Sequence, residues 1–306
     1  MEHISVTDPI GLAMERVRQV LFSPFDLGKW FAIGFCAWLS LLGERGFGGN
    51  FNSSSSNHSG DARQEFEHAR TFVAENLYWI VPLAIVLVVV GLALWVLFMW
   101  LSSRGKFMFL HCVALNRSEV VDPWNRHAGA AQSLFWFRIV LGLIGMVISL
   151  PLFVLAIVVT ISMLLHDNWN FAGIMALIGL GVGMVVLGLC FLLIRKLMTD
   201  FVVPIMFVRG NSCLDAWKEL YQLVAANFGG FVLYFLFQIV IGIAIGVMVL
   251  IAVLVTCCIA GCLLAIPYIG TVLFLPVIVF KRAYSLYYLA QYGPNYNVFP
   301  PATAAA

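Results

Sequence analysis

Hydrophobic positions recur with the same helical spacing at three places along the chain. In each place an Asp is followed by apolar residues two, six, nine and thirteen positions later, which is one face of an α-helix. Asp at the N-cap, with Pro at the first helical position, favours a helix start. The three Asp residues are Asp8, Asp122 and Asp215, and Pro follows the first two. The apolar sets are Ile10, Met14, Val17 and Leu21; Trp124, Ala128, Ala131 and Phe135; and Trp217, Tyr221, Val224 and Phe228.

Two long apolar runs follow each amphipathic segment. A helix needs about 20 apolar residues to cross a bilayer, and the first run reaches that length only if Phe25–Lys29 is included. The six predicted spans are approximately Trp30–Leu42, Leu77–Leu101, Ile139–Leu165, Phe171–Leu197, Phe231–Val255 and Leu263–Phe280. The pattern therefore predicts an all-α polytopic membrane protein with six transmembrane helices in three hairpin repeats. A cytoplasmic amphipathic interfacial helix precedes each hairpin.

We interpret residues 1–306 as a single membrane domain built from these repeats. Repeat 1 covers about 8–115, repeat 2 about 116–208 and repeat 3 about 209–292. A polar stretch at about 43–70, rich in Gly, Ser and Asn, is predicted to be a flexible external loop. Residues 293–306 form a C-terminal tail.

Composition agrees with a membrane protein. The chain is 62% hydrophobic and 10% charged, with a mean hydropathy of +0.98, which is more apolar than a soluble domain of this length. Lys and Arg are concentrated on one side of the expected topology, since 14 of the 17 flank the amphipathic segments and the termini. This bias predicts cytoplasmic N- and C-termini. No basic block indicates a nucleic-acid partner.

The predicted spans hold no ionisable side chain near the membrane midplane and no nucleophile with a base. Coupled transporters and intramembrane hydrolases usually need such groups, so we expect no catalytic residue, no metal and no cofactor. An interfacial enzyme acting on lipid headgroups would have to use the polar residues near the cytoplasmic side, which are His111, Asp122, Asp200 and Asp215.

Basic and aromatic residues gather on the predicted cytoplasmic side, where they are candidates for binding membrane lipids or a partner protein. Ordinary membrane anchoring is the alternative explanation. These candidates are Arg16, Arg18, Lys29, Trp124, Arg126, Arg138, Trp217 and Lys218.

Small-residue patterns occur on two spans, at Gly179 and Gly183 and at Gly242 and Gly246. Glycines four positions apart allow helices to approach closely. They predict helix packing, either within the chain or between copies in a homo-oligomer.

Three short segments resemble a bacterial family of six-span membrane proteins of unknown function. These are Pro24-Phe25 with Gly28-Lys29-Trp30, Asp215-Ala216-Trp217, and Phe280-Lys281-Arg282-Ala283-Tyr284 with Gln291-Tyr292-Gly293-Pro294. The chain is more distantly similar to the membrane domain of glycerophosphodiester phosphodiesterases. The resemblance implies a multi-pass location in the bacterial inner (cytoplasmic) membrane and supplies no catalytic residue.

We therefore expect a non-enzymatic integral membrane protein that binds lipid or a partner protein through its cytoplasmic interfacial helices. The alternatives are a transporter or channel for an apolar or amphipathic solute such as a lipid, and an interfacial lipid-headgroup enzyme.

Overall fold

The computed structural model of the protein describes residues 4–42, 76–165, 171–256, 261, 263, 264 and 266–299. Regular structure within these ranges is helical throughout, as expected. In chain order the elements are α1 (Asp8–Leu21), α2 (Leu27–Leu41), α4 (Leu77–Leu115), α5 (Val121–Arg126), α6 (Ala128–Leu165), α7 (Phe171–Leu197), the π-helix η1 (Met198–Val202), α8 (Val203–Arg209), α9 (Cys213–Ala226), α10 (Phe228–Val255), α12 (Pro267–Leu273), α13 (Leu275–Ala290) and the 3-10 helix η2 (Pro294–Tyr296). The expected external loop at 43–70 lies outside the described residues.

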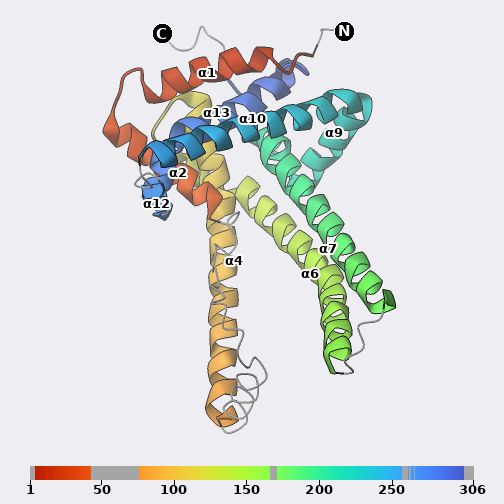
Figure 1. The fold of residues 1–306 in the computed structure, drawn as a ribbon. Coiled ribbons are helices and arrows are strands. Elements are labelled where there is room, and N and C mark those ends of the chain that lie inside the picture. The colour runs from red at the N-terminus through yellow and green to blue at the C-terminus, as the bar shows by residue number, and fades with distance from the viewer. Residues whose placement is uncertain are drawn as a thin grey trace.

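Helices that are distant in sequence pack together at one end of the molecule (Figure 1). We call this end the head and define it as α1, α2, residues 102–115 of α4, η1, α8 and α13. Phe107, Leu110, Phe201, Tyr284 and Tyr288 are fully buried in its core. Full burial of such a side chain contributes about 1.5–3 kcal/mol, so this core holds the head together.

The two ends of the described chain meet on the head. Gln291 accepts a hydrogen bond from the Ser5 amide at 2.8 Å and donates one to the Ser5 carbonyl at 2.9 Å. The Tyr284 hydroxyl donates to the Val6 carbonyl at 3.0 Å. These bonds fix the start of α1 to α13, against which α1 packs.

A glycine sets the close approach of α4 and α2. A Cβ added at Gly105 would lie 2.6 Å from the backbone carbonyl carbon of Leu39 and 2.6 Å from the backbone nitrogen of Ser40. No side chain fits in that space, so only glycine allows the two backbones to touch here. The contact fixes Lys106, the next residue of α4, at the junction with α2.

Three apolar helical segments extend away from the head (Figure 1). We call them the arms and define them as residues 77–101 of α4, 139–165 of α6 and 171–194 of α7. In each of these helices the most apolar stretch of 18 residues has a mean hydropathy between 2.7 and 3.0, and no residue of that stretch is buried within the protein. Such surfaces are stable in lipid hydrocarbon but not in water.

Four helices of the described chain are long and apolar enough to cross a membrane, and the number rises to five if α12 and α13 form one span bent by 64°. The fourth long helix, α10, packs on the head through Phe231 and Tyr234. In Figure 1 α10 runs across the head rather than beside the arms. The first predicted span is α2, which has only 15 residues. Six spans in three hairpin repeats are therefore not confirmed.

The predicted N-caps are wrong by one or more residues. The N-cap residues are Thr7, Val120 and Ser212, and each predicted Asp lies inside the first helical turn instead. In α9 the Ser212 hydroxyl accepts from the Asp215 amide at 3.3 Å and donates to the Asp215 carboxylate at 2.6 Å. A first-turn carboxylate also interacts favourably with the helix dipole, which explains why Asp occurs at these starts.

The predicted apolar stripes are only partly buried. Val17, Leu21, Ala131 and Phe135 are buried, whereas Met14, Tyr221 and Phe228 are more than half exposed. In α1 and α9 the buried face is shifted toward small residues, which are Ala13 in α1 and Cys213 and Ala216 in α9. Close packing against the head selects these small side chains, and spacing alone does not reveal this choice.

Candidate functional site

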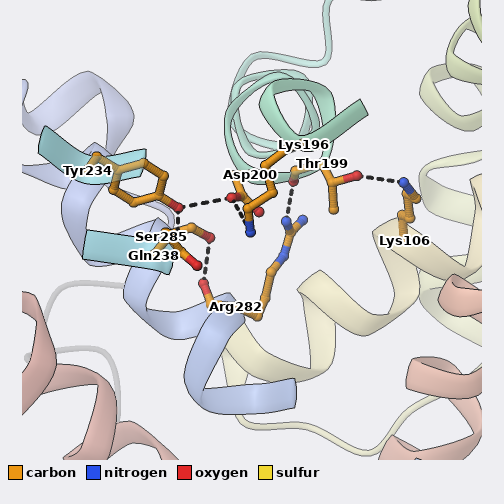
Figure 2. A network of polar contacts seen from close by, with 8 residues as sticks. All are labelled: Lys106, Lys196, Thr199, Asp200, Tyr234, Gln238, Arg282 and Ser285. Atoms are coloured by element: carbon orange, nitrogen blue, oxygen red, sulfur yellow. Dashed lines mark hydrogen bonds and ion pairs between the residues drawn. The ribbon is translucent and has the colours of Figure 1, made fainter. Parts of the chain in front are cut away.

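A π-helical turn separates α7 from α8 and carries the most strongly polar part of the head. Within η1 the Val203 amide donates to the Met198 carbonyl, five residues back. Pro204 has no amide hydrogen to donate to the Asp200 carbonyl, which favours the wider turn. Single π turns in long helices often occur at functional sites. Here the turn directs Thr199 and Asp200 toward α4, α10 and α13 (Figure 2).

Asp200 joins three elements through charge and hydrogen bonds. It is 6% exposed, accepts a hydrogen bond from the Tyr234 hydroxyl at 3.0 Å, and lies 2.8 Å from the Lys196 ammonium. Gln238, one turn further along α10, donates to the Tyr234 hydroxyl at 3.0 Å. The carboxylate is thus satisfied by one cation and one hydroxyl, as a buried charge requires.

Two buried cations from other helices meet at Thr199. The Lys106 ammonium of α4 donates to the Thr199 hydroxyl at 2.7 Å, and the Arg282 guanidinium of α13 donates to the Thr199 carbonyl. Lys106 is 4% exposed and Arg282 is 6% exposed. Ser285 donates to the Arg282 carbonyl at 2.8 Å. Both cations therefore contact uncharged oxygens of η1, as Figure 2 shows.

These groups border a cavity of about 290 Å³ in the head, which we call the head cavity. Three cations and one carboxylate line it, so it carries an excess of positive charge. The rest of the wall is mostly apolar. The lining residues are Ser40 and Leu41 of α2; Lys106 and Phe109 of α4; Thr199 and Asp200 of η1; and Phe274, Val277, Ile278, Lys281 and Arg282 at and after the break between α12 and α13.

A third buried cation, Arg138, lies where the arms leave the head. The Arg138 guanidinium donates to the hydroxyls of Ser102 and Ser103, both at 3.2 Å. Arg138 also lines a cavity of about 270 Å³ between α4, α6 and α7, together with Arg195. Arg138 is only 6% exposed, so it contributes to helix packing at this junction rather than to an open basic surface.

The remaining basic candidates near the N-terminus divide into surface and packing residues. Arg16 donates to the carbonyls of Val113 at 3.0 Å and Ala114 at 2.5 Å, and burial lowers the pKa of its guanidinium. Lys29 donates to the Asn116 side chain at 2.9 Å. Arg18 is exposed. Arg16 and Lys29 therefore stabilise the end of α4, and Arg18 remains available on the surface.

The aromatic candidates face the protein, while their basic neighbours are exposed. Trp124 lies beneath the Arg104 guanidinium, 4.7 Å from the ring centroid, and Trp217 stacks on Phe137 at 5.8 Å. Arg126 and Lys218 are exposed, and Lys218 lies 3.8 Å from Asp215. The structure thus places the eight candidates at several separate positions and does not bring them together as one site.

The four candidate packing glycines lie on open helix surfaces. A Cβ added at Gly179, Gly183, Gly242 or Gly246 meets no atom of the described chain within 4 Å. Within the described residues no helix packs closely against either pair.

Sequence reasoning did not identify the head cavity. Its cations stand just after long apolar runs, where basic residues are common flanking groups of a span. The sequence held one signal of this site. Lys106, Asp200 and Lys281-Arg282 each follow a different apolar run, and all lie on the same predicted side of the membrane. Of the four polar residues considered for an enzyme, the structure brings His111 and Asp122 together and places Asp200 in a different cluster.

The head and its apolar extensions define a helical protein with four or five helices suited to crossing a membrane. The chain belongs to a family of unknown function (DUF7544), whose family model matches residues 4–275. No curated protein and no solved structure matches the chain. The comparisons thus give no support to the similarity with glycerophosphodiester phosphodiesterases.

Proposed function

We propose that the protein is a non-enzymatic integral membrane protein that binds the anionic headgroup of a membrane lipid in the head cavity. The observation that carries this proposal is the charge of the lining, where Lys106, Lys281 and Arg282 accompany the single carboxylate of Asp200. That carboxylate already contacts Lys196 and Tyr234. Because excess buried charge is costly, an anion in the cavity would stabilise the arrangement.

The shape of the wall favours a lipid over a free inorganic anion. Phe109, Val277 and Ile278 give the cavity an apolar side beside its cations. A phosphate attached to a glycerol backbone matches this combination of charged and apolar surface. The first turn of α13 also borders the cavity, and the N-terminal end of a helix attracts negative charge.

The position of Lys106 along α4 also supports binding of a lipid headgroup in the head cavity. The arm of α4 ends at residue 101, and Lys106 follows little more than one turn later. If the arms lie in the hydrocarbon layer, the head cavity lies at the level of the lipid headgroups.

We further propose that the head faces the cytoplasm of a bacterial cell. The arms themselves hold no Lys or Arg, and Lys106, Arg138 and Arg195 lie just beyond their head ends, which supports the orientation through the positive-inside rule. Reporter fusions at the C-terminus test it. A fluorescent cytoplasmic reporter and an inactive periplasmic phosphatase are expected, and the reverse result would place the head outside.

Paired substitutions distinguish the head cavity from the predicted surface sites. Lys281→Gln removes one charge from the cavity, and the matched control Lys218→Gln removes one exposed charge from α9. We expect Lys281→Gln to weaken binding of phosphatidylglycerol about ten-fold, because one charge-assisted hydrogen bond contributes about 1.5 kcal/mol. Lys218→Gln should have little effect.

The measurement is the thermal stability of purified full-length protein titrated with phosphatidylglycerol, with phosphatidylcholine and with inorganic phosphate. Stabilisation by phosphatidylglycerol alone supports the lipid headgroup, whereas equal stabilisation by inorganic phosphate would favour a soluble anion. A loss of binding in Lys218→Gln but not in Lys281→Gln would move the site to the interfacial helices.

Transport of a lipid is the second candidate function. It is favoured by the 64° break between α12 and α13, because broken helices beside a polar site are common in transporters. The break lies at Phe274, which lines the head cavity. Reconstituted protein that moves fluorescent phosphatidylglycerol between leaflets would support transport, and binding without movement would support the first proposal.

A further inference from the structure

We propose that His111, Glu119 and Asp122 form a binding site for a divalent transition-metal ion such as Zn²⁺, separate from the head cavity. The ligand atoms of these three residues, one ring nitrogen and two carboxylate oxygens, all lie within 4.8 Å of one another. The sequence alone led us to expect no metal, because the predicted spans hold no ionisable side chain near the membrane midplane. The structure brings them together at the end of α4.

The buried imidazole is the strongest indication of a ligand. His111 is 2% exposed, and both of its ring nitrogens are buried without a hydrogen-bond partner. Leaving a buried polar atom unsatisfied costs about 1–3 kcal/mol, and such atoms are rare in native proteins. The rings beside it belong to His127 and Phe207, in edge contacts at 6.1 and 6.2 Å. A metal ion would satisfy one nitrogen of His111 directly.

The connection between α4 and α5 positions the two carboxylates. α4 ends at Leu115, and Asn116 adopts a left-handed conformation with φ 57° and ψ 33°. The Lys29 ammonium holds the Asn116 side chain at 2.9 Å. The chain then turns back, so that Glu119 and Asp122 reach the buried ring of His111.

Charge and chemistry also fit a divalent cation. Two carboxylates supply two negative charges, and one imidazole with carboxylates is a donor set that Zn²⁺, Fe²⁺ and Mn²⁺ accept. Ligand atoms about 2.1 Å from an ion lie within about 3.5 Å of each other in a tetrahedron. Both carboxylates are exposed and can rotate inward by the remaining distance. Water would occupy the open coordination positions.

Nearby basic residues compete only weakly for these carboxylates. Arg117 lies 3.8 Å from Glu119, and the two side chains are 65% and 51% exposed. An exposed ion pair of this kind contributes about 0–1 kcal/mol, which a metal ion readily displaces. Bound metal would tie the buried end of α4 to the start of α5 and thus fix the connection into α6.

The test measures binding of Zn²⁺ to purified full-length protein by competition with a fluorescent zinc chelator, after the metal has been removed. Glu119→Gln and Asp122→Asn change exposed side chains and should leave the fold intact. We expect each to weaken Zn²⁺ binding by at least about 100-fold, because each removes one of three protein ligands. The matched control Glu15→Gln, an exposed carboxylate on α1, should bind as tightly as the wild type.

Cobalt(II) substitution identifies the ligand type. Visible d–d bands without a thiolate-to-metal charge-transfer band are expected, and they should disappear in His111→Asn. Unchanged Zn²⁺ affinity in both Glu119→Gln and Asp122→Asn would overturn the proposal. A strong thiolate charge-transfer band would also overturn it by assigning the metal to cysteines.

Discussion

Helix α4 contributes one segment to the head and another to the arms, and the two segments lie in opposite environments. Residues 107–110 are buried among other helices, whereas Leu83, Ile85, Leu87 and Val88 are more than half exposed. Both stretches are strongly apolar, so hydrophobicity alone does not distinguish them. The difference lies in their partners, since the head is covered by protein and the arms require lipid.

The two regions also differ in where they keep charge. Lys106, Arg138, Asp200 and Arg282 are all buried in the head or at its junction with the arms. The described arm of α4, from residue 77 to residue 101, has no Asp, Glu, Lys or Arg. Protein contacts can satisfy buried charge with fixed dipoles, whereas lipid chains cannot. Selective chemistry is therefore expected in the head.

The largest effect that separates the two regions is expected from leucine truncation on α4. Leu110→Ala in the head should lower the free energy of unfolding by about 2–5 kcal/mol, since it opens a cavity in a packed core. Leu87→Ala in the arm removes a lipid-facing side chain and should change it by less than about 1 kcal/mol. Thermal unfolding of both variants in the same detergent measures the difference. Equal losses would show that the arm is also packed against protein.

Glycine substitution on the same helix sharpens the comparison. Gly105→Ala should destabilise the protein by about 1–3 kcal/mol, because the new methyl group would collide with the α2 backbone. Gly91→Ala in the arm adds a methyl group where no atom of another element lies within 4 Å and should stabilise the helix by about 0.5–1 kcal/mol. The same unfolding measurement applies. A neutral Gly105→Ala would contradict the close approach of α4 and α2.

The smallest effect is expected from the hydrogen bond between Tyr234 and Asp200. Tyr234→Phe keeps the ring in the core and removes only the hydroxyl, so the expected loss is about 1 kcal/mol. Combining it with Asp200→Asn in a double-mutant cycle isolates the pairwise energy. Exactly additive losses would show that the hydroxyl and the carboxylate do not interact.

Much of the helical architecture could be predicted from the sequence. The first amphipathic helix begins at Asp8 and ends at Leu21, and the long apolar runs are helices. α4 continues beyond its apolar run to Leu115, and α6 begins at Ala128, before its apolar run. Those extensions form the head core and its junction with the arms. Polar residues within them, such as Lys106 and Arg138, had no visible partner in the local sequence.

The head cavity could not be predicted because its contacts are distant in sequence. Lys106 and Thr199 are 93 positions apart, and Arg282 lies 83 positions beyond Thr199. Each basic residue alone matches an ordinary flanking charge of a span. Arg16 and Arg138 match surface cations in sequence, but in the fold they donate hydrogen bonds to a carbonyl of α4 and to a serine hydroxyl of α4.

The most direct test of the central claim is native mass spectrometry of the full chain released from a bilayer of mixed phosphatidylglycerol and phosphatidylcholine. We predict a 33.9 kDa chain, alone or as a multiple, that retains one phosphatidylglycerol for each copy, and the loss of this lipid in Lys281→Gln. Retention of neither lipid, or equal retention of both in wild type and variant, would contradict an anionic-lipid site in the head.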